Sequence, residues 1–118
     1  MHRFAKLDVY QKALKFTSKV YKFSNLLPES EKFGIISQLR RATTSIVLNI
    51  AEGSGSGSDT EFKRFLRISL RSGYEVNSIF DIIKELKLIK IETVDKLKEE
   101  LNEITAMISG LIKSLNNK

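Results

Sequence analysis

The stretch "NIAEGSGSGSDTEF", from Asn49 to Phe62, holds three of the six glycines and lies near the middle of the 118-residue chain. A phosphate-binding loop would need a strand before it and a Gly-Lys-Ser/Thr ending, but Asp59 stands where the lysine is required. A join between two domains also fails, because neither half alone has enough helices to bury its apolar faces. The stretch is therefore predicted to be a corner between two helices, with Ser58 and Glu61 forming a capping box at the start of the second.

On both sides of this corner, apolar residues recur every three or four positions, which predicts amphipathic helices over residues 29–52 and 59–87. The earlier helix is expected to begin at Pro28 or Glu29, because proline is tolerated in a first helical turn. Its predicted core stripe is Ile36, Leu39, Thr43, Ile46 and Ile50, and that of the later helix is Phe62, Leu66, Ser69, Gly73, Val76, Phe80 and Ile83.

Two further helices are predicted toward the ends of the chain, over residues 7–26 and 92–116. The last has apolar residues at alternating steps of three and four, namely Val94, Leu97, Leu101, Ile104, Ile108, Leu111 and Leu115. The first carries two apolar seams, one of Leu7, Tyr10, Leu14, Thr17 and Tyr21 and the other of Val9, Phe16 and Phe23. Such spacing predicts an all-α protein, residues 1–118 forming one domain folded as an up-and-down antiparallel four-helix bundle.

The composition argues against catalysis and against bound metals or cofactors. The chain has no cysteine, and its one histidine, His2, lies beside the start, so thiolate and histidine metal sites are not expected. The carboxylates are dispersed and no serine has a histidine to activate it, so we expect no enzyme and no cofactor. No apolar run approaches the roughly 18 residues of a membrane span and no signal peptide is recognised, so a cytoplasmic protein is expected.

The net charge of +6 is unevenly distributed along the sequence. Residues 1–50 carry nine lysines and arginines against three acidic residues, and the remainder carries eleven of each sign. This basic half either indicates an anionic partner or consists of solvated lysines.

The helix predicted over residues 29–52 has a second, polar face. Gln38, Arg41, Ser45, Asn49 and Glu52 follow one another by steps of three or four, with Glu75 of the next helix as a candidate partner for Arg41. Amides and hydroxyls of this kind suit partly buried contacts of fixed geometry. The row is predicted to be either a structural hydrogen-bond network or a subunit interface.

The helix predicted over residues 59–87 opens with clustered basic residues, Lys63, Arg64, Arg67 and Arg71. Cations near a helix N-terminus oppose its dipole, so a sequence tuned only for stability would avoid them. With Arg41, and with Arg40 two or three turns before the corner, these side chains are candidates for holding a phosphate backbone. The alternative is a solvated face paired with the acidic residues Glu99, Glu100 and Glu103.

The run "SQLRRATTSIVLNIAEGSGSGSDTEFKRFLRIS", Ser37 to Ser69, resembles the signature of the 23S rRNA-intervening sequence protein family, also called the four helix bundle proteins. The matching residues are Gln38, Arg40, Arg41, Ala42, Ser45, Ile46, Asn49, Ile50, Ala51, Glu52, Gly53, Ser58, Glu61, Phe62, Phe65 and Leu66. The flanking "LDVYQKAL" and "LPESEKFGI" also fit the family. The resemblance covers nearly the whole chain.

The resemblance implies a four-helix protomer that assembles as a homopentameric barrel. A related branch, the accessory variability determinant of diversity-generating retroelements, is a basic pentamer that binds a reverse transcriptase and nucleic acid. We therefore expect a non-enzymatic homo-oligomeric adaptor that binds RNA or DNA and presents it to a partner such as a reverse transcriptase. The alternative is a protein-interaction scaffold without nucleic-acid affinity.

Overall fold

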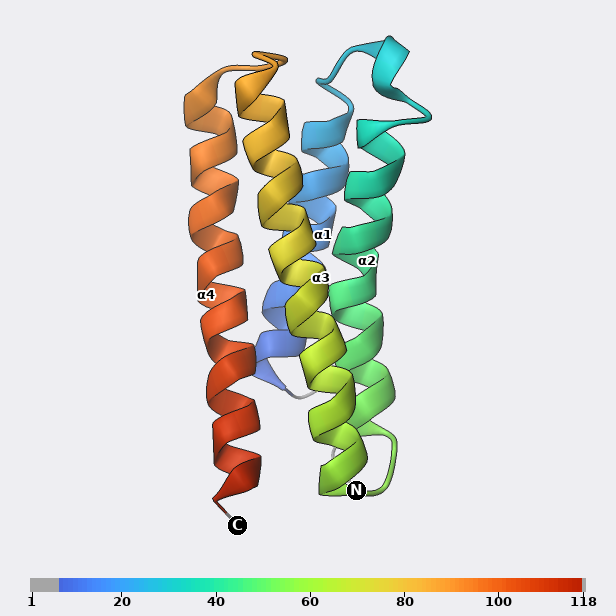
Figure 1. Cartoon of the computed structure of the whole chain (residues 1–118), viewed down its shortest axis with the longest axis vertical. Helices are drawn as coiled ribbons and strands as arrows, with labels where there is room; N and C mark the ends of the chain where they lie inside the picture. Colours follow the sequence, from blue (N-terminus) through green and yellow to red (C-terminus); the bar gives the residue numbers. More distant parts are fainter. Residues whose placement is uncertain (1–6, 118) are drawn as a thin grey trace.

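A computed structural model describes residues 7–117 of the chain. These residues form four α-helices and a short 3-10 helix, with no strand: α1 (Asp8–Ser24), η2 (Glu29–Glu31), α2 (Ile35–Ser54), α3 (Asp59–Glu85) and α4 (Ile91–Asn116). The helices run alternately up and down, and α4 returns beside α1 (Figure 1). The predicted all-α class with four helices is confirmed, whereas His2, Arg3 and Lys6 lie outside the described residues.

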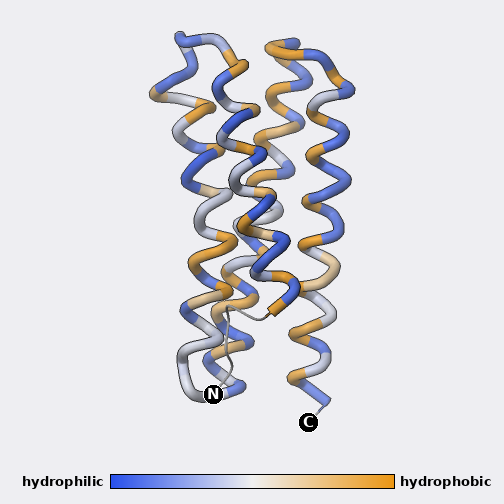
Figure 2. Tube along the Cα trace, turned by 180° about the vertical axis from the view of Figure 1, so that it is seen from behind, coloured by the Kyte–Doolittle hydropathy of each residue, from blue (hydrophilic) through white to orange (hydrophobic). Residues whose placement is uncertain are grey.

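One continuous core fills the space between the helices. The stripes predicted for α2 and α3 are buried, and Ser69 fits among apolar neighbours because its hydroxyl donates to the Ile46 carbonyl at 2.8 Å. Hydrophobic and hydrophilic residues alternate along each helix in Figure 2, as amphipathic helices around a core require. On α4 the prediction needs one change, because Ile112 is buried and Leu111 is only half-buried. No helix within residues 7–117 has the length and apolar composition needed to cross a bilayer.

Of the two seams predicted on α1, that of Val9, Phe16 and Phe23 is fully buried, whereas the other is only partly buried, with Leu7 and Tyr10 packed against the core. The buried apolar residues of α1 are Val9, Ala13, Phe16, Val20 and Phe23. The prediction was wrong for Leu14 and Tyr21, which are 40% and 39% exposed. Because each residue turns the helix by about 100°, the seam of Val9, Phe16 and Phe23 is completed by Ala13 and Val20, and Leu14 and Tyr21 fall beside it.

The start of α2 was also predicted wrongly. Pro28 has an extended backbone (ψ 140°), and residues Glu29–Glu31 form only a single 3-10 turn. Gly34 follows with a non-helical backbone (φ −112°, ψ −107°), which a helix begun at Pro28 or Glu29 could not pass through. The α-helix therefore begins at Ile35.

The corner between α2 and α3 is built as a close reversal. A Cβ on Gly53 would lie 2.7 Å from Cβ of Phe65, so glycine is required for the two helices to approach here. The predicted N-cap is confirmed, since the Ser58 hydroxyl accepts from the Glu61 amide at 3.1 Å. The Glu61 carboxylate pairs with Arg64 at 2.9 Å, the contact that it makes in place of the expected return bond of a capping box.

At the opposite end of α3, Lys87 takes a left-handed backbone conformation (φ 54°). The Leu88 amide donates to the Ile83 carbonyl at 3.2 Å, and the Lys87 amide donates to the Lys84 carbonyl at 3.1 Å. This pair of bonds is a Schellman motif, in which glycine is the usual residue at the position of Lys87. The motif ends α3 and turns the chain toward α4.

Candidate nucleic-acid interface

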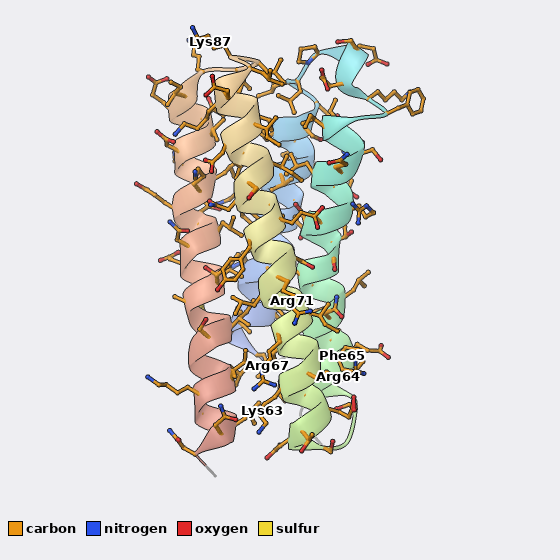
Figure 3. The ribbon with its side chains drawn as sticks, in the orientation of Figure 1. Lys63, Arg64, Phe65, Arg67, Arg71 and Lys87 are labelled. Carbon is orange, nitrogen blue, oxygen red and sulfur yellow. The ribbon has the colours of Figure 1, made fainter. Side chains whose placement is uncertain are left out.

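α3 lies between α2 and α4, and its first half carries the four clustered cations on its outer side (Figure 3). Arg67 is three residues from Arg64 and four residues from both Lys63 and Arg71, so the helix places it next to each of the other three. We call this set the basic face: Lys63, Arg64, Arg67 and Arg71. The structure therefore brings together the four cations that the sequence predicted for this helix.

The two cations nearest the corner have partners within the protein. The Lys63 ammonium donates to the side-chain oxygen of Asn116 on α4 at 2.9 Å. The Arg64 guanidinium pairs with Glu61 and lies 4.4 Å from the centre of the Phe65 ring. Since the Arg64 pair is between exposed side chains, a phosphate could replace Glu61 at little cost in free energy.

The other two cations, Arg67 and Arg71, are exposed and form no ion pair or hydrogen bond with any other residue in the range 7–117. Of the three acidic residues expected to neutralise them, Glu99 is exposed and forms no ion pair within residues 7–117, and the other two are engaged elsewhere. Glu103 pairs with Lys12 at 2.9 Å and Glu100 pairs with Lys19 at 2.7 Å. We call these two ion pairs between α1 and α4 the paired seam. The alternative of a face neutralised by α4 is thus contradicted for these two acids.

Arg40 lies apart from the basic face. Its guanidinium donates to the Ser24 hydroxyl at 2.9 Å and to the Asn25 side-chain oxygen at 3.0 Å, and it lies 4.9 Å from the centre of the Tyr21 ring. These contacts place Arg40 on the side of α2 that faces α1. It also lies about four helical turns before the corner, where two or three turns were expected. Its hydrogen bonds hold the C-terminal end of α1, so Arg40 is not part of the basic face.

The polar row of α2 runs along the seam with α3. Arg41 pairs with Glu75 at 3.3 Å, as predicted, and the Ser45 and Ser72 hydroxyls are 2.8 Å apart. The Asn49 amide donates to the carbonyl and the hydroxyl of Ser45, at 2.8 and 3.0 Å. The centre of the row therefore forms a hydrogen-bond network within the protomer.

The two ends of the row behave differently. Gln38 and Glu52 are exposed and form no hydrogen bond or ion pair within residues 7–117. They are available for contacts with another molecule, so a subunit interface along this edge remains a prediction.

The exposed ring of Tyr74 on α3 was not predicted from the sequence. Most aromatic residues lie at core spacing along the sequence, whereas Tyr74 is 58% exposed. The available signal was its spacing, because Tyr74 follows Arg67 by seven residues and Arg71 by three, and therefore lies on the outer side of α3.

Within residues 7–117, no cluster of three or more acidic, histidine or cysteine side chains could hold a metal ion.

Comparisons with known proteins identify the family. The chain matches the family described as 23S rRNA-intervening sequence protein over residues 5–110. It is similar to the crystal structure of a protein of unknown function from the S23 ribosomal protein family of Bacteroides thetaiotaomicron VPI-5482. The two share 25% sequence identity and a TM-score of 0.83 over 89% of this chain and 95% of that one. None of the curated proteins compared matches. The protein thus belongs to the 23S rRNA-intervening sequence protein family.

Proposed function

We propose that this protein is a non-enzymatic, homo-oligomeric adaptor that binds nucleic acid through the basic face. The observation that carries the proposal is the pair of exposed arginines, Arg67 and Arg71, which have no partner among residues 7–117. Guanidinium groups bind phosphate oxygens through two parallel hydrogen bonds, which makes arginine well suited to a nucleic-acid backbone.

The basic face is also unfavourable for the isolated protein. It contains three like-charge neighbours at i,i+3 or i,i+4 spacing: Lys63 with Arg67, Arg64 with Arg67, and Arg67 with Arg71. Each such pair destabilises a helix by about 0.2–0.5 kcal/mol. A bound polyanion would remove this repulsion. The arrangement therefore supports an anionic ligand.

Assembly and partner belong to the same proposal. The resemblance implies a pentamer, and the free ends of the polar row, Gln38 and Glu52, supply polar groups for a subunit contact. Five protomers would present five basic faces, and avidity would strengthen binding to a long strand. We propose that the assembly presents the strand to an enzyme, for which a reverse transcriptase is the candidate that the resemblance supplies.

The test is light scattering of the purified protein with mixed structured RNA and with duplex DNA, first at low and then at moderate salt. We expect one homogeneous oligomer whose mass rises with nucleic acid and falls again as salt is added. If four cations contact phosphates in each protomer, the log–log salt slope should be about −3.6 for a duplex and about −2.8 for a single strand. A mass indifferent to both nucleic acids would contradict the proposal.

A second candidate function is a protein-interaction scaffold, and one observation favours it. Large apolar side chains are exposed at the end of the bundle that carries the α1–α2 and α3–α4 connections: Leu26 (65%), Phe33 (91%), Leu86 (55%) and Ile91 (51%). An apolar end of this kind suits a protein partner. A homogeneous oligomer that binds no nucleic acid, and whose binding of a protein partner is lost on Phe33→Ser substitution, would favour the scaffold.

A further inference from the structure

The outer side of α3 continues beyond the arginines as a mixed basic and aromatic stripe. Arg67, Arg71, Tyr74 and Ser78 succeed one another by four, three and four residues, and all four are exposed. By helix geometry, Tyr74 lies about 4.5 Å along the axis from Arg71 and about 10.5 Å from Arg67. The stripe therefore places an aromatic ring one turn from a free guanidinium.

Tyr74 differs from the other tyrosines in having an uncovered ring. Tyr10 packs against the core, and the ring of Tyr21 has the Arg40 guanidinium 4.9 Å from its centre. Within residues 7–117, Tyr74 has neither an aromatic neighbour nor a cation over its face, and its hydroxyl forms no hydrogen bond. The Tyr74 ring is large, apolar and 58% exposed, and it follows Arg67 and Arg71, which have no partner within residues 7–117. Such a surface is suited to a ligand that is both aromatic and anionic.

A nucleic-acid strand carries both groups within each nucleotide. In a duplex, however, the faces of the bases are stacked on one another and only their edges are open to the grooves. A tyrosine ring can stack on a base only where the base is unpaired, in a single strand, loop, bulge or end. The position of Tyr74 thus discriminates between the two forms of nucleic acid.

We propose that the ligand of this surface is single-stranded nucleic acid, with an unpaired base stacked on Tyr74 and neighbouring phosphates held by Arg71 and Arg67. This inference rests on the proposed function and specifies its ligand. The arginines supply attraction that is independent of sequence, and the ring supplies the preference for unpaired bases.

The ring itself provides the test. The chain has three tyrosines and no tryptophan, so its intrinsic ultraviolet emission comes from tyrosine. The full chain is titrated with a short mixed-sequence oligonucleotide and, separately, with the duplex of that oligonucleotide, at fixed salt. We expect the single strand to bind more tightly and to quench the emission.

Three variants separate the contributions. Tyr74→Phe keeps the ring, so it should bind the strand within about twofold of the unsubstituted protein but lose the quenching. Tyr74→Leu should bind the strand roughly 5- to 100-fold more weakly, with unchanged affinity for the duplex. The control Tyr21→Phe, whose ring is covered by Arg40, should retain the quenching. Circular dichroism checks that each variant is folded.

Two results would overturn the inference: Tyr74→Leu binding the strand as tightly as the unsubstituted protein, or losing equal affinity for strand and duplex. If Arg67→Ala/Arg71→Ala weakens binding while Tyr74→Leu does not, the proposed function stands and only the stacking fails. If the unsubstituted protein binds neither ligand, the proposed function itself fails.

Discussion

The inner and outer faces of α3 differ in how their polar side chains are satisfied. On the inner face the Ser69 hydroxyl donates to the Ile46 carbonyl at 2.8 Å, and the Ser72 hydroxyl lies 2.8 Å from that of Ser45. On the outer face Arg67 and Arg71 have no partner within residues 7–117. The inner face of α3 is satisfied by contacts within the protein and the outer face carries these two exposed arginines, so substitutions on the two faces should affect different measurements.

A second contrast concerns where the positive charge is free. By sequence the excess of nine cations over three acidic residues lies in residues 1–50, and the rest of the chain is balanced. In the structure the paired seam uses two carboxylates of α4 to neutralise Lys12 and Lys19. Those carboxylates cannot also serve Arg67 and Arg71. The count along the sequence therefore does not show which cations have a carboxylate partner.

The largest effect is expected from the outer face. Arg67→Glu/Arg71→Glu should reduce nucleic-acid affinity by about 100-fold at low salt, because each substitution removes an attraction and adds a repulsion. The free energy of unfolding should not fall, since neither side chain has a partner within residues 7–117 to lose and the substitutions remove like-charge neighbours from the helix. Fluorescence anisotropy with a labelled strand measures the affinity, and chemical denaturation measures the free energy of unfolding. A variant that unfolds or binds unchanged would remove the distinction between the faces.

The inner face should respond in the opposite way, and two helical glycines provide a matched test. A Cβ on Gly73 would lie 2.7 Å from the Thr105 methyl, whereas a Cβ on Gly110 would meet nothing within 4 Å. We expect Gly73→Ala to destabilise the fold by about 1 kcal/mol and Gly110→Ala to stabilise it by about 0.5–1 kcal/mol. Denaturant midpoints measure both. If both substitutions changed the stability in the same direction, the α3–α4 contact at Gly73 would not be close.

Lys87, just beyond the end of α3, tests whether a cation outside the basic face affects nucleic-acid binding. It lies at the far end of the helix from the basic face (Figure 3), in the left-handed conformation that glycine adopts without strain. Lys87→Gly should raise the free energy of unfolding by about 0.5–1 kcal/mol and leave nucleic-acid affinity unchanged. Thermal melting and anisotropy are the two measurements. An affinity loss equal to that from a basic-face arginine would favour general charge attraction.

Opening the paired seam is expected to have only a small effect on stability. Glu100→Gln/Glu103→Gln should cost only about 0.2–1 kcal/mol of stability per pair, because Lys12, Lys19 and Glu103 are exposed and Glu100 is partly exposed. It should free Lys12 and Lys19 to attract phosphates and steepen the duplex salt slope by about 1.8. Affinity measured across a salt series checks this. An unchanged slope would mean that the lysines were not restrained by their carboxylates.

Much of the fold could be predicted from the sequence because it depends on local periodicity. The stripes of α2 and α3, the N-cap at Ser58 and the corner after Gly53 all follow from spacing and turn chemistry. The start of α2 could not, because it depends on the backbone conformation of Gly34. The core face of α1 could not either, since choosing between its two seams requires knowing where the neighbouring helices lie.

The candidate site was only partly predictable. Helical spacing was enough to group Lys63, Arg64, Arg67 and Arg71 on one surface. The partners of those cations depend on tertiary packing, which directs Arg40 to α1 and gives Glu100 and Glu103 to the lysines of α1. Spacing along a sequence specifies which residues share a helix face but not what that face meets.

We expect a cation of this protein to bind phosphate only where no carboxylate of the protein neutralises it, and two double variants compare the two situations. Arg67→Ala/Arg71→Ala and Lys12→Ala/Lys19→Ala remove the same charge from exposed positions on helices, one pair from the basic face and the other from the paired seam. Their affinities for one labelled single strand are compared at equal ionic strength. We predict that the arginine variant binds about tenfold or more weakly, while the lysine variant stays within about twofold of the unsubstituted protein. Equal losses would contradict this expectation, because binding would then follow net charge and not the basic face.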